Sequence, residues 1–289
     1  MKLVIGSAQF GLNYGITNKN GKVNKCEVKN ILKLAYKNGI NTIDTATGYG
    51  ECESVLGSLK IDNWNIITKI KPLEKNVSNI HEAILNQVKQ SMINLKKNML
   101  YGVLLHKPLE LIEKNGHEIW NSLNVLKNKN IVKKVGFSIY NPDELEILWD
   151  NGYYPDIVQA PYNVFDRRLK TSGWLLKLKN AKAEIHVRSI FLQGLLLTNL
   201  RDLPKFFCGW EKHFMIWENW LKDNNISKIS AALNFVLSEN LIDKVIVGVD
   251  NKEQLLDILN DYNSFNIKFP EYLEFLDERL LNPYNWELN

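Results

Sequence analysis

The 289-residue chain is long enough for one large barrel or two ordinary domains, and its 45% hydrophobic and 24% charged residues are typical of a soluble globular protein. Its net charge of +4 comes from basic residues scattered along the sequence, unlike the concentrated basic stripe of a nucleic-acid binder. No stretch approaches the roughly 20 apolar residues that cross a membrane, and the first apolar run is too short for a signal peptide. We therefore expect a cytoplasmic protein with neither a nucleic-acid nor a membrane partner.

The cysteines, Cys26, Cys52 and Cys208, are odd in number and have no CxxC spacing. This pattern argues against a disulfide framework or a thiolate zinc site, and it fits a reducing compartment. No group of His, Asp and Glu residues has the spacing of metal ligands, so we expect no metal.

Short apolar runs rich in Val and Ile recur along the chain, as expected of strands that are buried on both faces of a parallel sheet. They cover residues 2–6, 40–44, 65–70, 101–106, 132–138, 156–160, 184–189 and 244–249.

The segments between these runs have helical periodicity. In 78–97, for example, Ile80, Ile84 and Val88 lie on one stripe, and Ser78 is a candidate N-cap. Helices are predicted over 29–39, 78–97, 116–129, 142–151, 169–180, 226–239 and 252–260, and two further ones over 211–223 and 270–281 stand outside the alternation.

Strands that alternate with helices specify βαβ units and a parallel sheet. Eight such units without a linker or a change in composition predict a single (β/α)8 barrel, a TIM barrel, spanning residues 1–289. A doubly wound sheet of six or seven strands with a small second domain is the alternative. No glycine-rich phosphate-binding fingerprint follows a predicted strand.

Polar side chains follow three adjacent predicted strands. Asp44 ends the second, with Tyr49 in the loop behind it, Lys69 lies near the end of the third, and His106 ends the fourth. In a parallel barrel these ends meet at one rim, where active sites lie. A neighbouring ammonium should lower the pKa of the phenol, a buried carboxylate should hold the ammonium, and an imidazole should fix a carbonyl oxygen. The set predicts a general acid for carbonyl reduction.

With these residues the chain resembles the aldo-keto reductase family over nearly its whole length. The matching segments, in order, are DTATGYGECESVLG (44–57), TK (68–69), LLHKP (104–108), GFS (136–138), VQAPYN (158–163) and a G-x-x-x-x-x-Q segment (248–254). The resemblance implies that Tyr49 is the proton donor, that Lys69 and Asp44 tune it, and that His106 orients the substrate carbonyl.

The resemblance also implies a nicotinamide cofactor, NADP(H) or NAD(H), lying across the barrel mouth. In this role Ser138 and Gln159 match carboxamide-binding positions, and Arg188 stands where relatives stack an aromatic residue on the nicotinamide. The remaining cofactor-binding positions that it implies are Ser7, Ser189, Phe191, Gln193, Gly248, Asp250, Gln254 and Asp257.

Asp250 stands where other members have a phosphate-binding Ser, in the loop that should face the adenosine ribose. An acidic side chain there repels a 2′-phosphate and can bind a 2′-hydroxyl group. The family mostly uses NADPH, and we therefore predict that this chain accepts NADH unusually well.

The predicted function is reduction of an aldehyde, ketone or keto-sugar by NAD(P)H. A short chain after Pro270 predicts an open pocket, and together with Arg188 it suggests a sugar or nucleotide-sugar substrate. The alternative is a regulatory or accessory barrel that binds the nicotinamide cofactor with little turnover.

Overall fold

The computed structural model describes residues 1–18, 20–74, 76–262 and 267–286, and its centre is a closed barrel of eight parallel strands. Each strand pairs with the next in chain order, and the last pairs with the first. The strands are β1 (Leu3–Gly6), β2 (Thr42–Asp44), β3 (Asn65–Ile70), β4 (Leu100–Leu105), β5 (Val132–Ser138), β6 (Ile157–Pro161), β7 (Glu184–Arg188) and β8 (Lys244–Gly248). The predicted TIM barrel is confirmed, and the doubly wound sheet was the wrong alternative.

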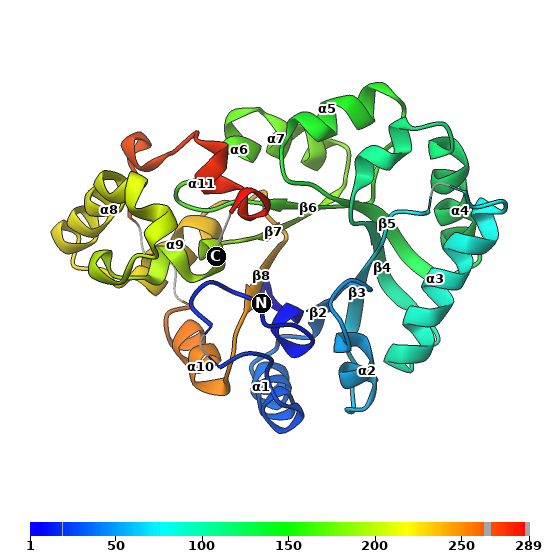
Figure 1. Cartoon of the computed structure of the whole chain (residues 1–289), viewed down its shortest axis with the longest axis horizontal. Helices are drawn as coiled ribbons and strands as arrows, with labels where there is room; N and C mark the ends of the chain where they lie inside the picture. Colours follow the sequence, from blue (N-terminus) through cyan, green and yellow to red (C-terminus); the bar gives the residue numbers. More distant parts are fainter. Residues whose placement is uncertain (19, 75, 263–266, 287–289) are drawn as a thin grey trace.

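Helices surround the strands as an outer ring (Figure 1). They are α1 (Lys25–Lys37), α2 (Cys52–Gly57), α3 (Ile80–Leu95), α4 (Gly116–Asn128), α5 (Asp143–Asp150), α6 (Arg168–Thr171), α7 (Trp174–Asn180), α8 (Glu211–Asp223), α9 (Lys228–Leu237), α10 (Lys252–Asn260) and α11 (Glu278–Leu281). Short 3-10 turns lie at Ala8–Phe10, Pro108–Ile112, Leu192–Leu197, Leu200–Asp202, Lys205–Trp210, Glu271–Leu273 and Pro283–Asn285. Within the described ranges, no helix has the length and apolar character to cross a membrane.

The apolar core has two parts. The larger part lies between the strands and the helices, where the Val and Ile side chains of the strands meet the apolar stripes of the helices. The smaller part is the cluster of Ile67, Leu104 and Ile157. Because side chains two residues apart share a face of a strand, this cluster lies directly beneath Lys69, His106 and Gln159. The cluster is therefore an apolar layer beneath the polar side chains at the carboxyl ends of the strands.

Several helix boundaries differ from the sequence prediction; for example, the helix predicted over 29–39 is α1, which begins at Lys25 and ends at Lys37. The N-cap of α3 is Asn79, whose side chain accepts a hydrogen bond from the Glu82 N–H, and not Ser78. The helix predicted over 169–180 is broken into α6 and α7, because Gly173 adopts a left-handed conformation with φ of 81°. Asn79 serves as the cap because its short side chain reaches the N–H three residues further along the chain.

The helix predicted over 270–281 is wrong for most of its length. The chain forms a single 3-10 turn at Glu271–Leu273 and becomes helical again only in α11. Between these turns the Phe275 N–H donates to the carbonyl of Phe165, 2.8 Å away, instead of to its own segment. Asp277 then caps α11 by accepting from the Arg279 N–H. Tertiary hydrogen bonding thus overrides the helical period.

Candidate active site

All eight strands deliver a residue singled out from the sequence to the same end of the barrel. In strand order these residues are Ser7, Asp44, Lys69, His106, Ser138, Gln159, Arg188 and Gly248. Because every pairing is parallel, the carboxyl ends of the strands form one rim.

A buried ion pair lies at the centre of this rim. The Lys69 ammonium is 2.6 Å from Asp44 Oδ2, and only 1% and 5% of the two side chains is exposed. Lys69 also donates to the carbonyl of Thr45, 3.1 Å away. The second carboxylate oxygen, Asp44 Oδ1, accepts from Gln159 Nε2 at 2.7 Å. With both charges paired and hydrogen-bonded, the pair is fixed in one geometry.

Tyr49 lies above the ion pair. Its hydroxyl accepts a hydrogen bond from Lys69 Nζ at 3.5 Å, and its ring meets that of His106 edge-on, with centroids 6.1 Å apart. The structure thus brings Asp44, Tyr49, Lys69 and His106 together as expected.

The electrostatics of Tyr49 differ from the sequence prediction. Removal from water, and next the Asp44 carboxylate, raise the pKa of Tyr49 above its usual value instead of lowering it. The Lys69 ammonium is neutralised by Asp44 at short range, so it does not reverse this effect. The phenol therefore holds its proton at neutral pH, which is the state that a proton donor needs.

Glycines around Tyr49 allow two loops to meet at close range. A Cβ atom at Gly11, in the loop after β1, would overlap the carbonyl of Tyr49. Gly50 has a φ of 57°, the left-handed region that favours glycine, and a Cβ there would crowd the carbonyl of Gly11. The Tyr49 N–H donates to the carbonyl of Ala46, which closes the turn. The glycines thus fix the backbone that carries the phenol.

His106 is a neutral imidazole at neutral pH. Burial first, and then the Lys69 ammonium, lower the pKa of His106 to about 4. A neutral ring can donate from one nitrogen to a carbonyl oxygen without bringing a second charge to the site.

The helix that follows Tyr49, α2, is held in place by hydrogen bonds to residues at β1 and β3. The Cys52 thiol donates to the carbonyl of Ser7 at 3.1 Å, and burial raises its pKa to about 11, so it is a packing group and not a nucleophile. Glu53 is buried and accepts from the Thr68 hydroxyl at 2.7 Å. Both residues support the junction between the Tyr49 loop and α2.

A cleft of about 240 Å³ begins at Asp44 and Tyr49 and reaches the loop between β8 and α10. Twelve of the residues singled out from the sequence line it: Ser7, Asp44, Tyr49, Gln159, Arg188, Ser189, Phe191, Gln193, Gly248, Asp250, Gln254 and Asp257. Lys69, His106 and Ser138 do not line it. Ser138 is buried in register with Gln159 on the neighbouring strand.

Two buried hydrogen-bond acceptors without a partner lie in this cleft, one at its end near Asp44 and one at its end in the loop between β8 and α10. Gln159 Oε1 lies at the Asp44 part, and Asp250 Oδ1 lies at the β8–α10 part, where the Asp250 N–H donates to Gln254 Oε1. A buried acceptor costs free energy unless a donor reaches it. A dinucleotide fits this arrangement, since a carboxamide N–H can reach Gln159 and a ribose hydroxyl can reach Asp250.

The sequence interpretation missed the loop between β1 and α1, which forms one wall of the cleft. Tyr14, Gly15, Thr17 and Asn18 line the cleft opposite Gly194 in the loop after β7. A Cβ atom at Gly194 would overlap the Thr17 hydroxyl, so the two loops touch across the cleft. The glycine- and aromatic-rich segment GSAQFGLNYG (6–15) was the available signal.

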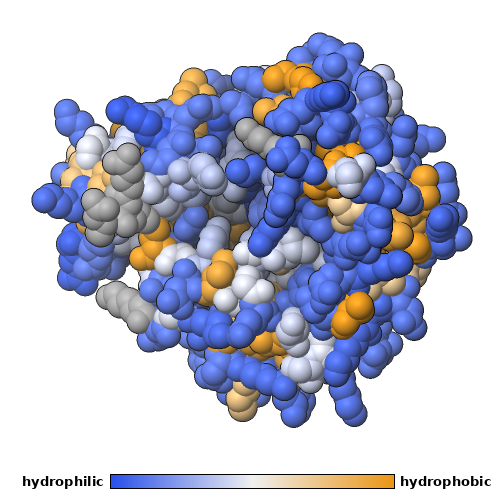
Figure 2. All heavy atoms as spheres, turned by 45° about the vertical axis from the view of Figure 1, so that its right-hand side comes forward, coloured by the Kyte–Doolittle hydropathy of each residue, from blue (hydrophilic) through white to orange (hydrophobic). Residues whose placement is uncertain are grey.

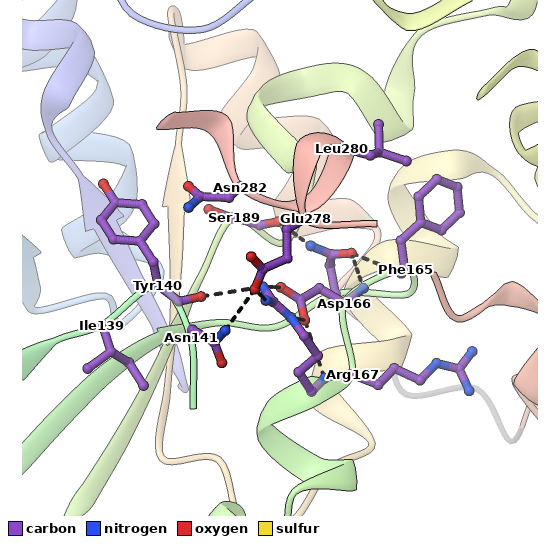
Figure 3. A network of polar contacts seen from close by, with 12 residues as sticks. Ile139, Tyr140, Asn141, Phe165, Asp166, Arg167, Ser189, Glu278, Leu280 and Asn282 are labelled. Atoms are coloured by element: carbon purple, nitrogen blue, oxygen red, sulfur yellow. Dashed lines mark hydrogen bonds and ion pairs between the residues drawn. The ribbon is translucent and has the colours of Figure 1, made fainter. Parts of the chain in front are cut away.

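The C-terminal segment is fastened to the rim by a polar network (Figure 3). Arg168 pairs with Asp166 at 2.8 Å and with Glu278 at 2.9 Å. Glu278 also accepts from Asn141 Nδ2 at 2.7 Å, and Arg168 donates to the carbonyl of Tyr140. The network joins α11 to the loops after β5 and β6, which fixes the C-terminal segment against this end of the barrel.

The face seen in Figure 2 is largely hydrophilic, with small hydrophobic patches separated from one another. Among the described residues, no group of three or more His, Cys, Asp or Glu side chains is arranged to hold a metal ion.

Comparisons with known proteins agree with one another on the family of this chain. The model of the aldo/keto reductase family matches residues 2–273. D-arabinose 1-dehydrogenase from Saccharomyces cerevisiae is 22% identical, over 98% of this chain and 91% of its own length.

Solved structures share the fold. Aldo-keto reductase AKR11C1 from Bacillus halodurans, in its holo form, has a TM-score of 0.74 at 16% identity, covering 99% of this chain and 94% of its own. PA4992 from Pseudomonas aeruginosa, assigned to the aldo-keto reductases, has a TM-score of 0.66 at 21% identity, covering 90% of this chain and 88% of its own. The match of the family model over nearly the whole chain shows that this protein belongs to the aldo-keto reductase family.

Proposed function

We propose that this protein reduces a carbonyl group to an alcohol, with a nicotinamide dinucleotide as hydride donor and Tyr49 as the proton donor. The observation that carries the proposal is the arrangement of the Tyr49 hydroxyl 3.5 Å from Lys69 Nζ, above the buried Lys69–Asp44 pair and beside the His106 ring. These are the parts needed to deliver a proton to a developing alkoxide in a partly buried site.

The cofactor would lie in the cleft. Gln159 would hold its carboxamide, Ser189 and Gln193 would border its pyrophosphate, and Asp250 would accept from its adenosine ribose. When bound, the group would supply the hydride for the carbonyl carbon.

The residues of the rim divide the remaining work. His106, neutral at neutral pH, donates to the carbonyl oxygen and orients it toward Tyr49. Tyr49 keeps its proton until negative charge develops on that oxygen, and then gives it up. Lys69 lies close enough to stabilise the phenolate that remains, while Asp44 holds Lys69 in place.

Charge along the cleft favours NADH over NADPH in this proposal. Among the described residues that line it, Arg188 is the only Lys or Arg, whereas Asp250 and Asp257 lie at the β8–α10 part. Lys252, the one basic residue between 249 and 256, does not line the cleft and lies 3.6 Å from Glu253. A 2′-phosphate would meet carboxylates there without a compensating cation.

A sugar is the substrate class that the comparisons support, since the yeast relative is named for D-arabinose. A keto-sugar or a nucleotide-linked sugar also agrees with the polar rim of the cleft.

The proposal is tested by mixing the purified protein with NADH or NADPH and a panel of aldehydes, ketones and sugars. Consumption of the reduced cofactor with a carbonyl compound, and none without it, is the expected result. Tight binding of the cofactor with no consumption across the panel would instead support an accessory barrel with little turnover.

A further inference from the structure

Arg188 ends β7 and lines the cleft together with Tyr49, yet it pairs with no carboxylate of the described residues. Its donors reach only neutral groups. Nη2 donates to the carbonyl of Ile139 at 2.9 Å, and Nη1 donates to the Ser189 hydroxyl at 3.2 Å. Partly buried charges are usually paired. An unpaired guanidinium in a cleft is therefore a candidate binding site for an anion.

The hydrogen bonds of Arg188 show where its positive charge lies. By bonding to the carbonyl of Ile139, the side chain crosses β6 toward the end of β5, away from β8 and the Asp250 part of the cleft. Its guanidinium lies 4.3 Å from the centre of the Tyr140 ring. The charge therefore lies on the β5 side of the rim, and it acts on the pKa values of both Tyr49 and His106.

The acidic groups nearest to this side are already engaged. Asp44 is paired with Lys69, and Glu278 is shared by Arg168 and Asn141. The Tyr140 ring that carries Arg188 also contacts Tyr284, and a second cation, Lys107, lies 5.7 Å from the centre of the Tyr284 ring.

Lys107 likewise forms no ion pair with a described residue. The region around the Tyr140 and Tyr284 rings thus has two cations without an ion pair among the described residues, Arg188 and Lys107, in contrast to the two carboxylates at the β8–α10 part of the cleft.

We propose that Arg188 selects carbonyl substrates that carry an anionic group, a carboxylate or a phosphate, and holds that group while the carbonyl faces Tyr49. Its planar fork is fixed on one face by Tyr140 and on one edge by the Ile139 carbonyl, which leaves N–H groups for an oxyanion. The assignment gives Arg188 a role toward the substrate beyond the stacking on nicotinamide that its position implies. It rests on the carbonyl reduction proposed above.

Two matched pairs of substrates test this. One pair is 4-oxobutanoate and butanal, and the other is glyceraldehyde 3-phosphate and glyceraldehyde. For each pair, kcat/KM is measured at saturating NADH in wild type and in Arg188→Gln. Any effect of the substitution on cofactor binding is common to both members of a pair. The ratio of kcat/KM for the charged substrate to kcat/KM for the uncharged substrate therefore reports only the interaction with the anionic group.

We expect wild type to prefer the charged member of at least one pair by about 10-fold or more, and Arg188→Gln to abolish that preference, so that kcat/KM falls about 10-fold further for the charged member than for the uncharged member. Loss of the preference in the 4-oxobutanoate pair would show that Arg188 binds a carboxylate, and loss in the glyceraldehyde 3-phosphate pair would show that it binds a phosphate. Arg188→Lys should restore part of the preference, and Arg201→Gln, a change at an exposed arginine outside the cleft, should leave it unchanged.

Equal losses for charged and uncharged substrates, or a wild type with no preference in either pair, would overturn the role of Arg188. If wild type turns over neither pair, binding decides the inference separately from the proposed reduction, which the wider panel of carbonyl compounds tests. Saturation-transfer NMR should then detect 4-hydroxybutanoate or glycerol 3-phosphate on wild type and lose that signal in Arg188→Gln. Signals that do not depend on Arg188, or no signal from either anion, would contradict it.

Discussion

The ammonium of Lys69 lies 2.6 Å from a carboxylate oxygen of Asp44, and both side chains are almost completely buried. Breaking a buried pair leaves an uncompensated charge, whereas an exposed pair of similar length contributes little.

We therefore predict that Lys69→Met lowers the free energy of unfolding by about 3–5 kcal/mol. The double variant Asp44→Asn, Lys69→Met should lose less than the sum of the two single variants, because no charge is then left unpaired. Urea denaturation at pH 7 measures all three. Lys127→Met is the matched control, since Lys127 and Asp156 are 2.7 Å apart but about a third exposed, and we expect a cost of at most about 1 kcal/mol. Equal costs for Lys69 and Lys127 would contradict this.

His106 should make the fold sensitive to mild acid. Its folded-state pKa of about 4 lies below the usual value of 6.5, so between these values the unfolded chain binds a proton that the folded chain does not. Stability from this group is therefore complete above pH 6.5 and is lost as the pH falls toward 4. At pH 4.5 the loss should be on the order of 2 kcal/mol relative to pH 7.

The measurement is the free energy of unfolding at pH 7 and pH 4.5 for wild type and His106→Asn. The variant should lose less stability on acidification, whereas His117→Asn, a change at an exposed residue of α4, should behave as wild type. An identical pH dependence in wild type and His106→Asn would show that His106 is not the responsible group.

Asp250 should discriminate against NADPH. Its buried, unpartnered Oδ1 belongs to a side chain that lines the cleft. Two charges about 4 Å apart repel by roughly 1 kcal/mol in water and by more where screening is weaker. Asp250→Ser should thus tighten NADPH binding about 10-fold, with little gain for NADH.

Dissociation constants for both cofactors can be followed by fluorescence of the reduced nicotinamide. Glu253→Ser, on an exposed neighbour that does not line the cleft, is the control and should change neither constant. A wild type that binds NADPH more than a hundredfold tighter than NADH, with no change in Asp250→Ser, would reject the idea.

The strands and the polar rim could be predicted because they leave local signals. The strands are buried on both faces and read as short apolar runs, so the predicted 65–70 and 132–138 coincide with β3 and β5. The position of Lys69 followed from its place near a strand end, because parallel strands end at one rim.

The parts that escaped prediction depend on contacts between distant residues. The cleft wall around Tyr14 lies in a loop without periodicity, and its position is set by the contact of Thr17 with Gly194. The segment after Pro270 has a helical pattern, but the Phe275 N–H donates to the distant carbonyl of Phe165 and not to a carbonyl of its own segment. The pKa of Tyr49 is raised first by burial of the phenol and then by the Asp44 carboxylate, and spacing along the chain shows neither.

The most direct test of the proposed chemistry is the comparison of wild type with Tyr49→Phe. The substitution keeps the ring and its contact with His106 but removes the proton donor. The measurement is kcat with a carbonyl substrate at saturating reduced cofactor, together with the dissociation constant of that cofactor. We predict a fall in kcat of roughly 10²–10⁴-fold and a dissociation constant within about twofold of wild type. A kcat within about threefold of wild type would show that Tyr49 is not the general acid.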